Sequence, residues 1–190
     1  SRVMNEYRVM KFDESIFLTG FMASGKSSVG KLLAKKLDRP FTDLDSLIEK
    51  SEKQSIREIF DKYGESYFRQ KEWDQLLEVT KSFKGVVALG GGALHNQNVV
   101  DHLKLHGLMI FIKTPIEVIT NRVLRNTRRP MAIAKNGKLK SRQALFDELN
   151  ILYLARIGYY QQAQIILEST GEETKEEQVI KIFEKLKRYV

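Results

Sequence analysis

The sequence contains no cysteine, no proline-rich linker and no low-complexity tract. Without cysteine the chain can form neither a disulfide nor a thiolate metal site, which fits a protein of the cytoplasm. No apolar run reaches the roughly 18 residues that a membrane-spanning helix needs. The segment Ser1–Met10 is polar and lacks the apolar centre of a signal peptide. These absences predict a cytoplasmic protein that does not associate with a membrane.

Acidic residues are fewer than basic ones, with 24 Asp and Glu against 32 Lys and Arg, so the net charge is +8. Much of the basic excess lies in Arg122–Arg142, which contains no Asp or Glu. Such a charge favours anionic partners, either a nucleic acid or a nucleotide with an acidic metabolite. Because the excess is concentrated in one segment, it suggests a phosphate-handling loop at least as well as a nucleic-acid surface.

The chain of 190 residues has about the length of one domain, and no internal repeat divides residues 1–190. Short apolar runs alternate with stretches of helical spacing, which predicts an α/β fold with a five-stranded parallel sheet covered on both faces. Strands are predicted over 15–19, 40–44, 85–89, 108–113 and 163–167. Helices are predicted over 27–37, 46–53, 55–63, 66–82, 96–105, 115–126, 141–162 and 175–189.

A glycine-rich loop follows the first predicted strand. The run Gly20-Phe21-Met22-Ala23-Ser24-Gly25-Lys26-Ser27 fits the phosphate-binding pattern G-x-x-x-x-G-K-S/T, and a strand and an amphipathic helix flank it. Backbone N–H groups of such a loop and of the helix start bind anions. This nucleotide site is assigned to Ala23, Ser24, Gly25, Lys26, Ser27 and Ser28. Lys26 is expected to reach the β- and γ-phosphates of ATP, and the Ser27 hydroxyl to bind Mg²⁺.

The loop indicates a nucleotide without giving the reaction. A G-protein would need a base-selecting N-K-x-D run, which the sequence lacks. A motor or AAA-type ATPase would normally have a strand ending in Asp beside the loop strand, whereas the predicted strand 85–89 runs into Gly90–Gly92. The remaining class is a small kinase that phosphorylates a bound metabolite.

Two further features follow predicted strands, and carboxyl ends of parallel strands lie at one edge of a sheet. Asp43 and Asp45 stand at the end of the second strand, where a carboxylate can accept the proton of an attacking hydroxyl, although the pair can instead form a turn or cap a helix. Gly90–Gly92 follow the third strand and let backbone amides approach a ligand, although they can also be a flexible turn.

The order and spacing of these motifs are similar to those of the shikimate kinase family. The resemblance rests on Gly20–Ser27, Asp43-Leu44-Asp45, Phe68-Arg69 with Glu72, Gly90–Gly92 and Arg129-Pro130, and it extends from about Ser15 to the end of the chain. It implies a three-layer α/β/α P-loop kinase fold with a mobile lid. It also implies ATP-dependent phosphorylation of the 3-hydroxyl of shikimate, in the pathway towards chorismate.

The resemblance assigns roles on the nucleotide side. Asp43 would support Mg²⁺ beside Ser27, and Asp45 would accept a hydrogen bond from the acceptor hydroxyl. Arg129, with Lys26 and Asp45, would be catalytic, because a lid cation over the transferring phosphate stabilises the charge of the transition state. Arg122 matches the arginine that packs on adenine.

The resemblance also assigns the acceptor side. Arg69 would pair with the carboxylate of shikimate through its two-pronged guanidinium, with Glu72 holding it, although the two could form an ordinary surface ion pair. The amides of Gly91 and Gly92 would bind shikimate, and Arg156 would be a second carboxylate-binding arginine. The acceptor-binding part would span about residues 43–72.

The chain departs from the family pattern near the lid, which is expected over about residues 126–144. Gly158 stands where the family has proline in an R-x-P-x-Y run. The distance from Arg129 to Arg156 is also longer than the family pattern, with the extra length around 132–140, which leaves Arg142 as a rival to Arg156.

Two other functions remain open from the sequence. Another metabolite kinase, such as a gluconate or nucleoside monophosphate kinase, would share the phosphate loop. A basic nucleic-acid-binding protein with a regulatory P-loop would share the charge, although no reading module is visible. The favoured prediction is a monomer that uses shikimate, ATP and Mg²⁺ and binds neither nucleic acid nor membrane.

Overall fold

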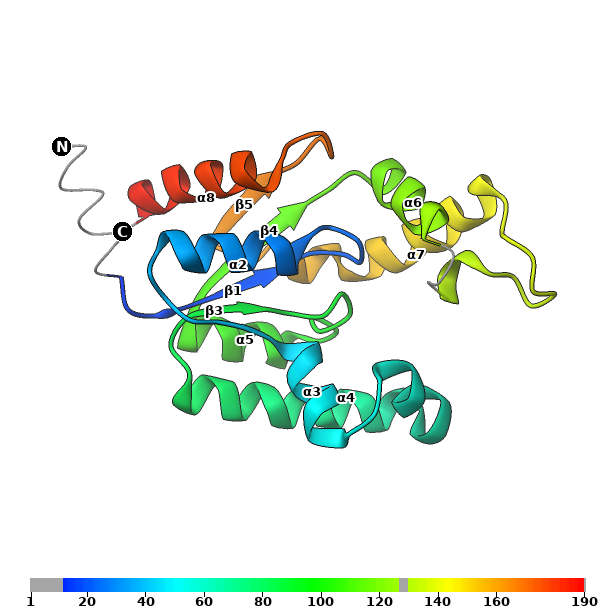
Figure 1. Cartoon of the computed structure of the whole chain (residues 1–190), viewed down its shortest axis with the longest axis horizontal. Coiled ribbons are helices and arrows are strands. Elements are labelled where there is room, and N and C mark those ends of the chain that lie inside the picture. The colour runs from blue at the N-terminus through cyan, green and yellow to red at the C-terminus, as the bar shows by residue number, and fades with distance from the viewer. Residues whose placement is uncertain (1–11, 127–129, 190) are drawn as a thin grey trace.

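The structure is a computed structural model and describes residues 12–126 and 130–189. Within these residues the centre is a five-stranded parallel sheet with the order β2-β3-β1-β4-β5 (Figure 1). The strands are β1 Ser15–Thr19, β2 Phe41–Asp43, β3 Val86–Ala88, β4 Gly107–Lys113 and β5 Ile165–Glu168. This sheet confirms the predicted α/β fold.

Helices cover both faces of the sheet, and the alternation of side chains along β1 shows how. Ile16 and Leu18 pack into one apolar cluster with α2 and α8, whereas Phe17 points to the opposite cluster with α5, α6 and α7. The helices are α2 Lys26–Lys36, α3 Leu44–Glu52, α4 Ile56–Ser82, α5 Gln97–His106, α6 Ile116–Arg125, α7 Arg142–Tyr160 and α8 Lys175–Tyr189. The result is the predicted three-layer architecture.

The second strand and the helix that follows it, α3, differ slightly from their predicted bounds. The strand ends at Asp43 and α3 begins at Leu44, two residues before the predicted start at Ser46. The physical reason is capping, because a side-chain oxygen of Asp43 accepts the backbone N–H of Ser46 at 3.2 Å. The short strand therefore passes directly into a helix that carries Asp45 in its first turn.

The two helices predicted over 55–63 and 66–82 join into one bent helix, α4. The bend lies at Gly64, with φ 84° and ψ 178°. This backbone conformation is open essentially to glycine alone. Gly64 therefore sets the angle between an amino-terminal arm that carries Phe60 and a longer arm that carries Arg69.

Residues 130–141, before α7, form a short hairpin that extends away from the sheet (Figure 1). It begins in a 3₁₀ turn, Pro130–Ala132, and its two sides meet at an antiparallel bridge between Ile133 and Leu139. Lys140, near its end, donates to Glu148 of α7 at 2.7 Å. The extra length predicted around 132–140 is thus an ordered hairpin. The motion of the lid stays a prediction, and Arg129 lies outside the described residues.

The sheet gathers the predicted functional segments at one edge. The phosphate-loop run follows β1, Asp45 lies in the first turn of α3 directly after β2, and Gly90–Gly92 follow β3, so all three lie at the carboxyl ends of neighbouring parallel strands. Across residues 12–126 and 130–189, none of the helices has both the length and the apolar composition that spanning a membrane requires.

Candidate active site

The phosphate loop curls between β1 and α2 in the shape that an anion site requires. Ala23 and Gly25 both have positive φ angles, 57° and 84°. Gly20 has no room for a side chain, since a Cβ there would lie 2.8 Å from the carbonyl oxygen of Ile112. Left-handed residues within a tight loop turn successive N–H groups toward one concavity. The loop predicted from the sequence is therefore formed.

Lys26 folds back over this loop. Its ammonium group donates to the carbonyl oxygens of Gly20 and Phe21 at 2.8 and 3.0 Å and to the hydroxyl of Ser24 at 3.3 Å. An ammonium group has three N–H donors, so a phosphate oxygen bound by Lys26 must replace one of these acceptors. The lysine is already in place above the concavity of the loop.

Ser27 and Asp43 form the candidate magnesium site. The Ser27 hydroxyl donates to one carboxylate oxygen of Asp43 at 2.5 Å, while the other oxygen caps α3. Both predicted roles of Asp43, cap and metal partner, are therefore geometrically compatible. Hydroxyl and carboxylate oxygens are donors that suit Mg²⁺, which usually takes few protein ligands and completes its shell with water and phosphate. The donor set of these residues fits the ion.

Asp45 is the most perturbed acid of the site. Its Oδ1 atom is buried and accepts no hydrogen bond from the described residues. Burial, followed by repulsion from Asp43 and Glu72, raises the pKa of Asp45 to about 6. A Cβ at Gly90 would lie 2.6 Å from Oδ1, so glycine at this position leaves room for the Asp45 carboxylate. Asp45 thus holds an unsatisfied oxygen where a hydroxyl donor would be stabilising.

Arg69 and Glu72 form a buried ion pair on α4. One guanidinium nitrogen of Arg69 donates to both carboxylate oxygens of Glu72 at 3.0 and 3.1 Å. The Glu72 side chain is only 4% exposed, so the alternative of an ordinary surface ion pair is wrong. Burial raises the pKa of Glu72, and the attraction of Arg69 opposes that rise. A Cβ at Gly92 would collide with the Arg69 guanidinium, which explains the third glycine.

Two side chains of α7 hold the glycine run from the other side. Arg156 donates to the carbonyl oxygen of Gly92 at 2.8 Å, and the Tyr160 hydroxyl donates to that of Gly91 at 2.7 Å. Tyr160 is 1% exposed. Sequence reasoning missed this role of Tyr160, although its position four residues after Arg156, on the same helix face, was a usable signal. The rival Arg142 instead donates to the Asn121 side chain at 3.0 Å.

Two cavities meet at Asp45. The phosphate cavity, about 450 Å³, is formed by the loop residues Met22–Ser28 with Asp43, Asp45, Leu89, Gly90 and Gly91. The acceptor cavity, about 320 Å³, contains Arg69, Glu72 and Arg156. It is completed by Phe21, Met22, Asp45, Ile56, Phe60, Phe68, Gly90, Gly91, Gly92, Met131 and Leu152. A molecule in each cavity would therefore share a wall made of Met22, Asp45, Gly90 and Gly91.

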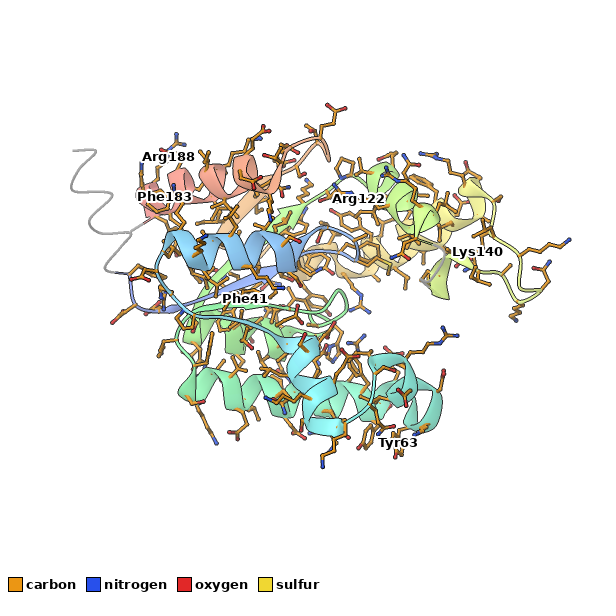
Figure 2. All side chains as sticks on the ribbon, viewed as in Figure 1. Phe41, Tyr63, Arg122, Lys140, Phe183 and Arg188 are labelled. Atoms are coloured by element: carbon orange, nitrogen blue, oxygen red, sulfur yellow. The ribbon has the colours of Figure 1, made fainter. Side chains whose placement is uncertain are left out.

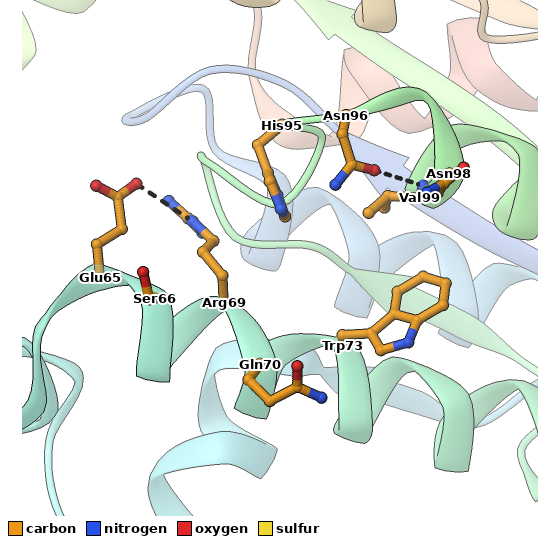
Figure 3. A pocket seen from close by; sticks show the side chains of 9 residues that line it. All are labelled: Glu65, Ser66, Arg69, Gln70, Trp73, His95, Asn96, Asn98 and Val99. Carbon is orange, nitrogen blue, oxygen red and sulfur yellow. Dashed lines mark hydrogen bonds and ion pairs between the residues drawn. The ribbon is translucent and has the colours of Figure 1, made fainter.

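A third, outer cavity of about 600 Å³ lies beyond Arg69 (Figure 3). Arg69 is the one described residue that lines both this space and the acceptor cavity. Trp73 and His95 also line this cavity. Figure 3 shows Arg69 paired with Glu65, whose carboxylate lies 3.6 Å from Nε of Arg69. Because Trp73 is the single tryptophan of the chain, its fluorescence reports on the surroundings of Arg69.

Arg122 lies beside the phosphate loop, on the nucleotide side of the site. From α6 it donates to the carbonyl oxygen of Ala23 in the phosphate loop at 2.8 Å and to that of Gly171 at 3.3 Å (its place on α6 is marked in Figure 2). The guanidinium therefore joins the phosphate loop to the loop that follows β5. The predicted contact with adenine stays a prediction, while the position beside Ala23 is compatible with it.

Comparison with known proteins agrees with this geometry. A sequence profile described as shikimate kinase matches residues 22–187. Shikimate kinases from Chlorobium phaeobacteroides and Chloroherpeton thalassium are each 37% identical to the chain, over 95% and 83% of its length and 95% and 84% of theirs. The solved shikimate kinase from Acinetobacter baumannii in complex with shikimate has a TM-score of 0.84 at 30% identity, with 96% of this chain and 97% of that one covered.

A gluconokinase from Sinorhizobium meliloti is also similar in structure, with a TM-score of 0.55 at 16% identity over 94% of each chain. At that identity the likeness shows a shared fold and nothing further. The profile and the curated relatives, in contrast, extend over most of the sequence at an identity that defines a family. The chain belongs to the shikimate kinase family.

Proposed function

We propose that this chain transfers the γ-phosphoryl group of ATP to the 3-hydroxyl of shikimate. The observation that carries the proposal is the position of Asp45 in the wall shared by the phosphate and acceptor cavities. Phosphoryl transfer requires the attacking oxygen to lie in line with the γ-phosphate, and a carboxylate at the junction can orient that hydroxyl. The family membership of the chain supports the choice of substrate.

On the acceptor side, the carboxylate of shikimate would be bound by Arg69 and Arg156, with the amides of Gly91 and Gly92 beside it. Glu72 holds Arg69 in position, and Arg156 is held against Gly92. Prior fixation of both arginines reduces the entropy lost when the acid binds. The acceptor hydroxyl would donate to the unpaired Oδ1 of Asp45, whose raised pKa also suits it to accept the proton.

On the nucleotide side, the loop amides of Ala23–Ser28 and Lys26 would bind the phosphates, and Arg122 would pack on the base. Ser27 and Asp43 would hold Mg²⁺, which supplies positive charge to the phosphate oxygens during transfer. Arg129 would add a second cation from the lid, over about residues 126–144. The acceptor-binding part would span about residues 43–72 of a single domain.

We also propose a cellular location, an oligomeric state and a set of partners for the enzyme. It acts in the cytoplasm as a monomer on two small substrates, without nucleic acid or membrane. The concentration of basic residues in the segment Arg122–Arg142 supports anionic small molecules as partners. The gluconate alternative is less well supported, because the structural likeness to a gluconokinase extends to the fold alone.

A coupled assay of ADP release tests the proposal. The purified chain is given MgATP with shikimate, gluconate, AMP or no acceptor. We expect release that depends on shikimate and stays at the background rate with the others. Release without an acceptor, or only with another acceptor, would contradict the shikimate assignment and leave the phosphate-loop assignment standing.

A further inference from the structure

The loop between β5 and α8 is organised around one carboxylate, that of Glu173. Its two oxygens accept the backbone N–H groups of Thr170, at 2.9 and 3.1 Å, and of Gly171, at 3.1 Å. The Ser169 hydroxyl and the Lys181 ammonium group also donate to it, at 3.1 and 3.3 Å. The Glu173 side chain is 8% exposed. One largely buried carboxylate therefore accepts four donor groups, three from this loop and one from α8.

These hydrogen bonds keep Glu173 ionised. Burial alone would raise the pKa of Glu173, but the donors from the backbone of Thr170 and from Ser169 and Lys181 outweigh that effect and lower it to about 2. A carboxylate that accepts several N–H bonds is stabilised in its charged form. The loop is thus built around a fixed negative charge at every pH at which the enzyme is expected to work.

The bonds of Glu173 fix the loop rather than the helix that follows it. The amino end of α8 has its own cap, since the backbone N–H of Glu177 donates to the Thr174 hydroxyl at 3.1 Å and Glu177 accepts the N–H of Thr174 at 3.4 Å. Two of the donors to Glu173 instead belong to Thr170 and Gly171, at the tip of the loop. A purely structural role at the start of α8 does not account for this arrangement.

The tip of the loop contacts α6, the helix that carries Arg122. Gly171 has φ +88°, and a Cβ there would lie 2.5 Å from the side chain of Val118 on that helix. The carbonyl oxygen of Gly171 accepts Arg122 at 3.3 Å, and the same guanidinium donates to Ala23 of the phosphate loop at 2.8 Å. A continuous chain of contacts therefore runs from Glu173 through Gly171 and Arg122 to the phosphate loop.

We propose that Glu173 is a positioning residue for the nucleotide: its carboxylate holds the loop 169–174 in the shape that presents the Gly171 carbonyl to Arg122, and so fixes Arg122 at the base end of the site. The inference rests on the proposed function only for the place of the base beside Arg122. Glu173 itself touches no substrate. It acts on the nucleoside part of ATP and leaves the phosphate-binding loop amides unchanged.

The test compares two ligands of the same site by isothermal titration calorimetry with Mg²⁺ present. ADP has a base and pyrophosphate has none, so a defect at the base end weakens ADP alone. Glu173→Gln keeps the shape of the side chain and removes its charge. Since hydrogen bonds to charged groups are stronger than neutral ones by about 1 kcal/mol, we expect ADP to bind about fivefold to tenfold more weakly and pyrophosphate to bind as before.

Two variants serve as matched controls. Glu172→Gln removes the same charge from the adjacent, exposed residue, whose side chain makes no hydrogen bond or ion pair with any residue that the structure describes, and should change neither affinity. Thr174→Ala removes the cap of α8, and should lower the unfolding temperature without separating ADP from pyrophosphate. In the Arg122→Ala background, Glu173→Gln should weaken ADP less than twofold further, because both changes act through one contact.

Equal weakening of ADP and pyrophosphate in Glu173→Gln would overturn the inference, as would unchanged ADP binding. A full additional loss in the Arg122→Ala background would also overturn it, because Glu173 would then act by another route. Binding is measured without acceptor, so the result is separate from the shikimate assignment. Normal ADP binding with no shikimate turnover would remove the proposed acceptor and leave this inference standing.

Discussion

The two cavities that meet at Asp45 are built in opposite ways. The phosphate cavity takes most of its wall from consecutive loop residues, whose backbone amides and positive φ angles follow from a short sequence pattern. The acceptor cavity collects residues from the phosphate loop, α3, α4, the glycine run, the 3₁₀ turn and α7. Binding of phosphate is thus specified locally, whereas recognition of the acceptor depends on tertiary packing.

The acceptor side and the nucleotide side also differ in how their acidic side chains are stabilised. On the acceptor side two acids are held away from water, and burial raises the pKa of both Asp45 and Glu72. On the nucleotide side the ordering acid, Glu173, has its pKa lowered to about 2 by hydrogen bonds. The acceptor side therefore holds destabilised charge that a substrate can satisfy, and the nucleotide side is satisfied before any ligand binds.

The largest expected effect is on the phosphate side. Lys26→Ala removes the cation that reaches the transferring phosphates, and we expect kcat to fall by about a thousandfold or more. The coupled assay of ADP release measures it, with Lys31→Ala on the exposed face of α2 as the control. A residual rate within tenfold of the unmodified enzyme would show that Lys26 does not contact the transferring group.

The next effect is at the junction of the cavities. Asp45→Asn keeps the shape of the side chain and removes its capacity to accept a proton, and we expect kcat to fall by about a hundredfold. In the unmodified enzyme kcat should rise with pH through about 6, because the ionised form of Asp45 is the active one and its pKa is raised to about 6. Asp61→Asn, on the exposed surface of α4, is the control.

A pH–rate profile with no step near 6 and a normal kcat in Asp45→Asn would limit Asp45 to a packing role. If Asp45→Asn loses the step near pH 6 but keeps nearly the same kcat, Asp45 orients the hydroxyl without accepting its proton. The two outcomes separate a base from an orienting group at the same position.

A smaller effect should separate the two substrates. Arg69→Lys keeps the charge and loses the forked geometry, so the KM for shikimate should rise by about tenfold while the KM for ATP changes little. Arg57→Lys, on the exposed side of the same helix, is the matched control. Titration of Trp73 fluorescence with shikimate gives the same comparison at equilibrium. An equal rise in both KM values would count against a carboxylate-binding role.

The last effect concerns stability rather than rate. A raised carboxyl pKa stabilises the fold below the unfolded value of 3.8, and this contribution is lost as the pH rises through about 6. Asp45→Asn removes the cost of the buried charge at neutral pH, and should stabilise the fold by up to about 3 kcal/mol. Thermal unfolding at about pH 3 and about pH 7.5, which lie on either side of this window, measures it. An equal unfolding temperature for the variant and the unmodified protein at the higher pH would contradict the assigned environment.

The sequence predicts the fold well because local patterns carry it. The apolar runs of β1, β3 and β4 are buried on both faces, and a buried parallel strand reads as a continuous apolar run. Helix spacing, the phosphate-loop pattern and Pro115 before α6 likewise act over a few residues. The small errors at Asp43 and Leu44 come from a side-chain cap, which shifts a boundary without changing the elements.

The acceptor side could be predicted only in part, because its contacts join distant segments. Arg69 and Glu72 read as a surface pair from their spacing alone, and their burial depends on the glycine run and on α7. The contact of Tyr160 with Gly91 spans 69 positions, so the helical spacing of Tyr160 from Arg156 indicates a shared face but not the partner. The sequence shows the extra length around 132–140. It does not show that the two sides of this segment pair through Ile133 and Leu139.

The most direct test of the account is to identify the phosphorylated product by phosphorus NMR of the reaction with MgATP and shikimate. Direct transfer between the two cavities predicts a single phosphomonoester signal, coupled to the proton on carbon 3 of the acid, that grows in step with ADP. Growth of inorganic phosphate in step with ADP, or a phosphomonoester at another position, would contradict the claim that Asp45 joins the two substrates at one wall.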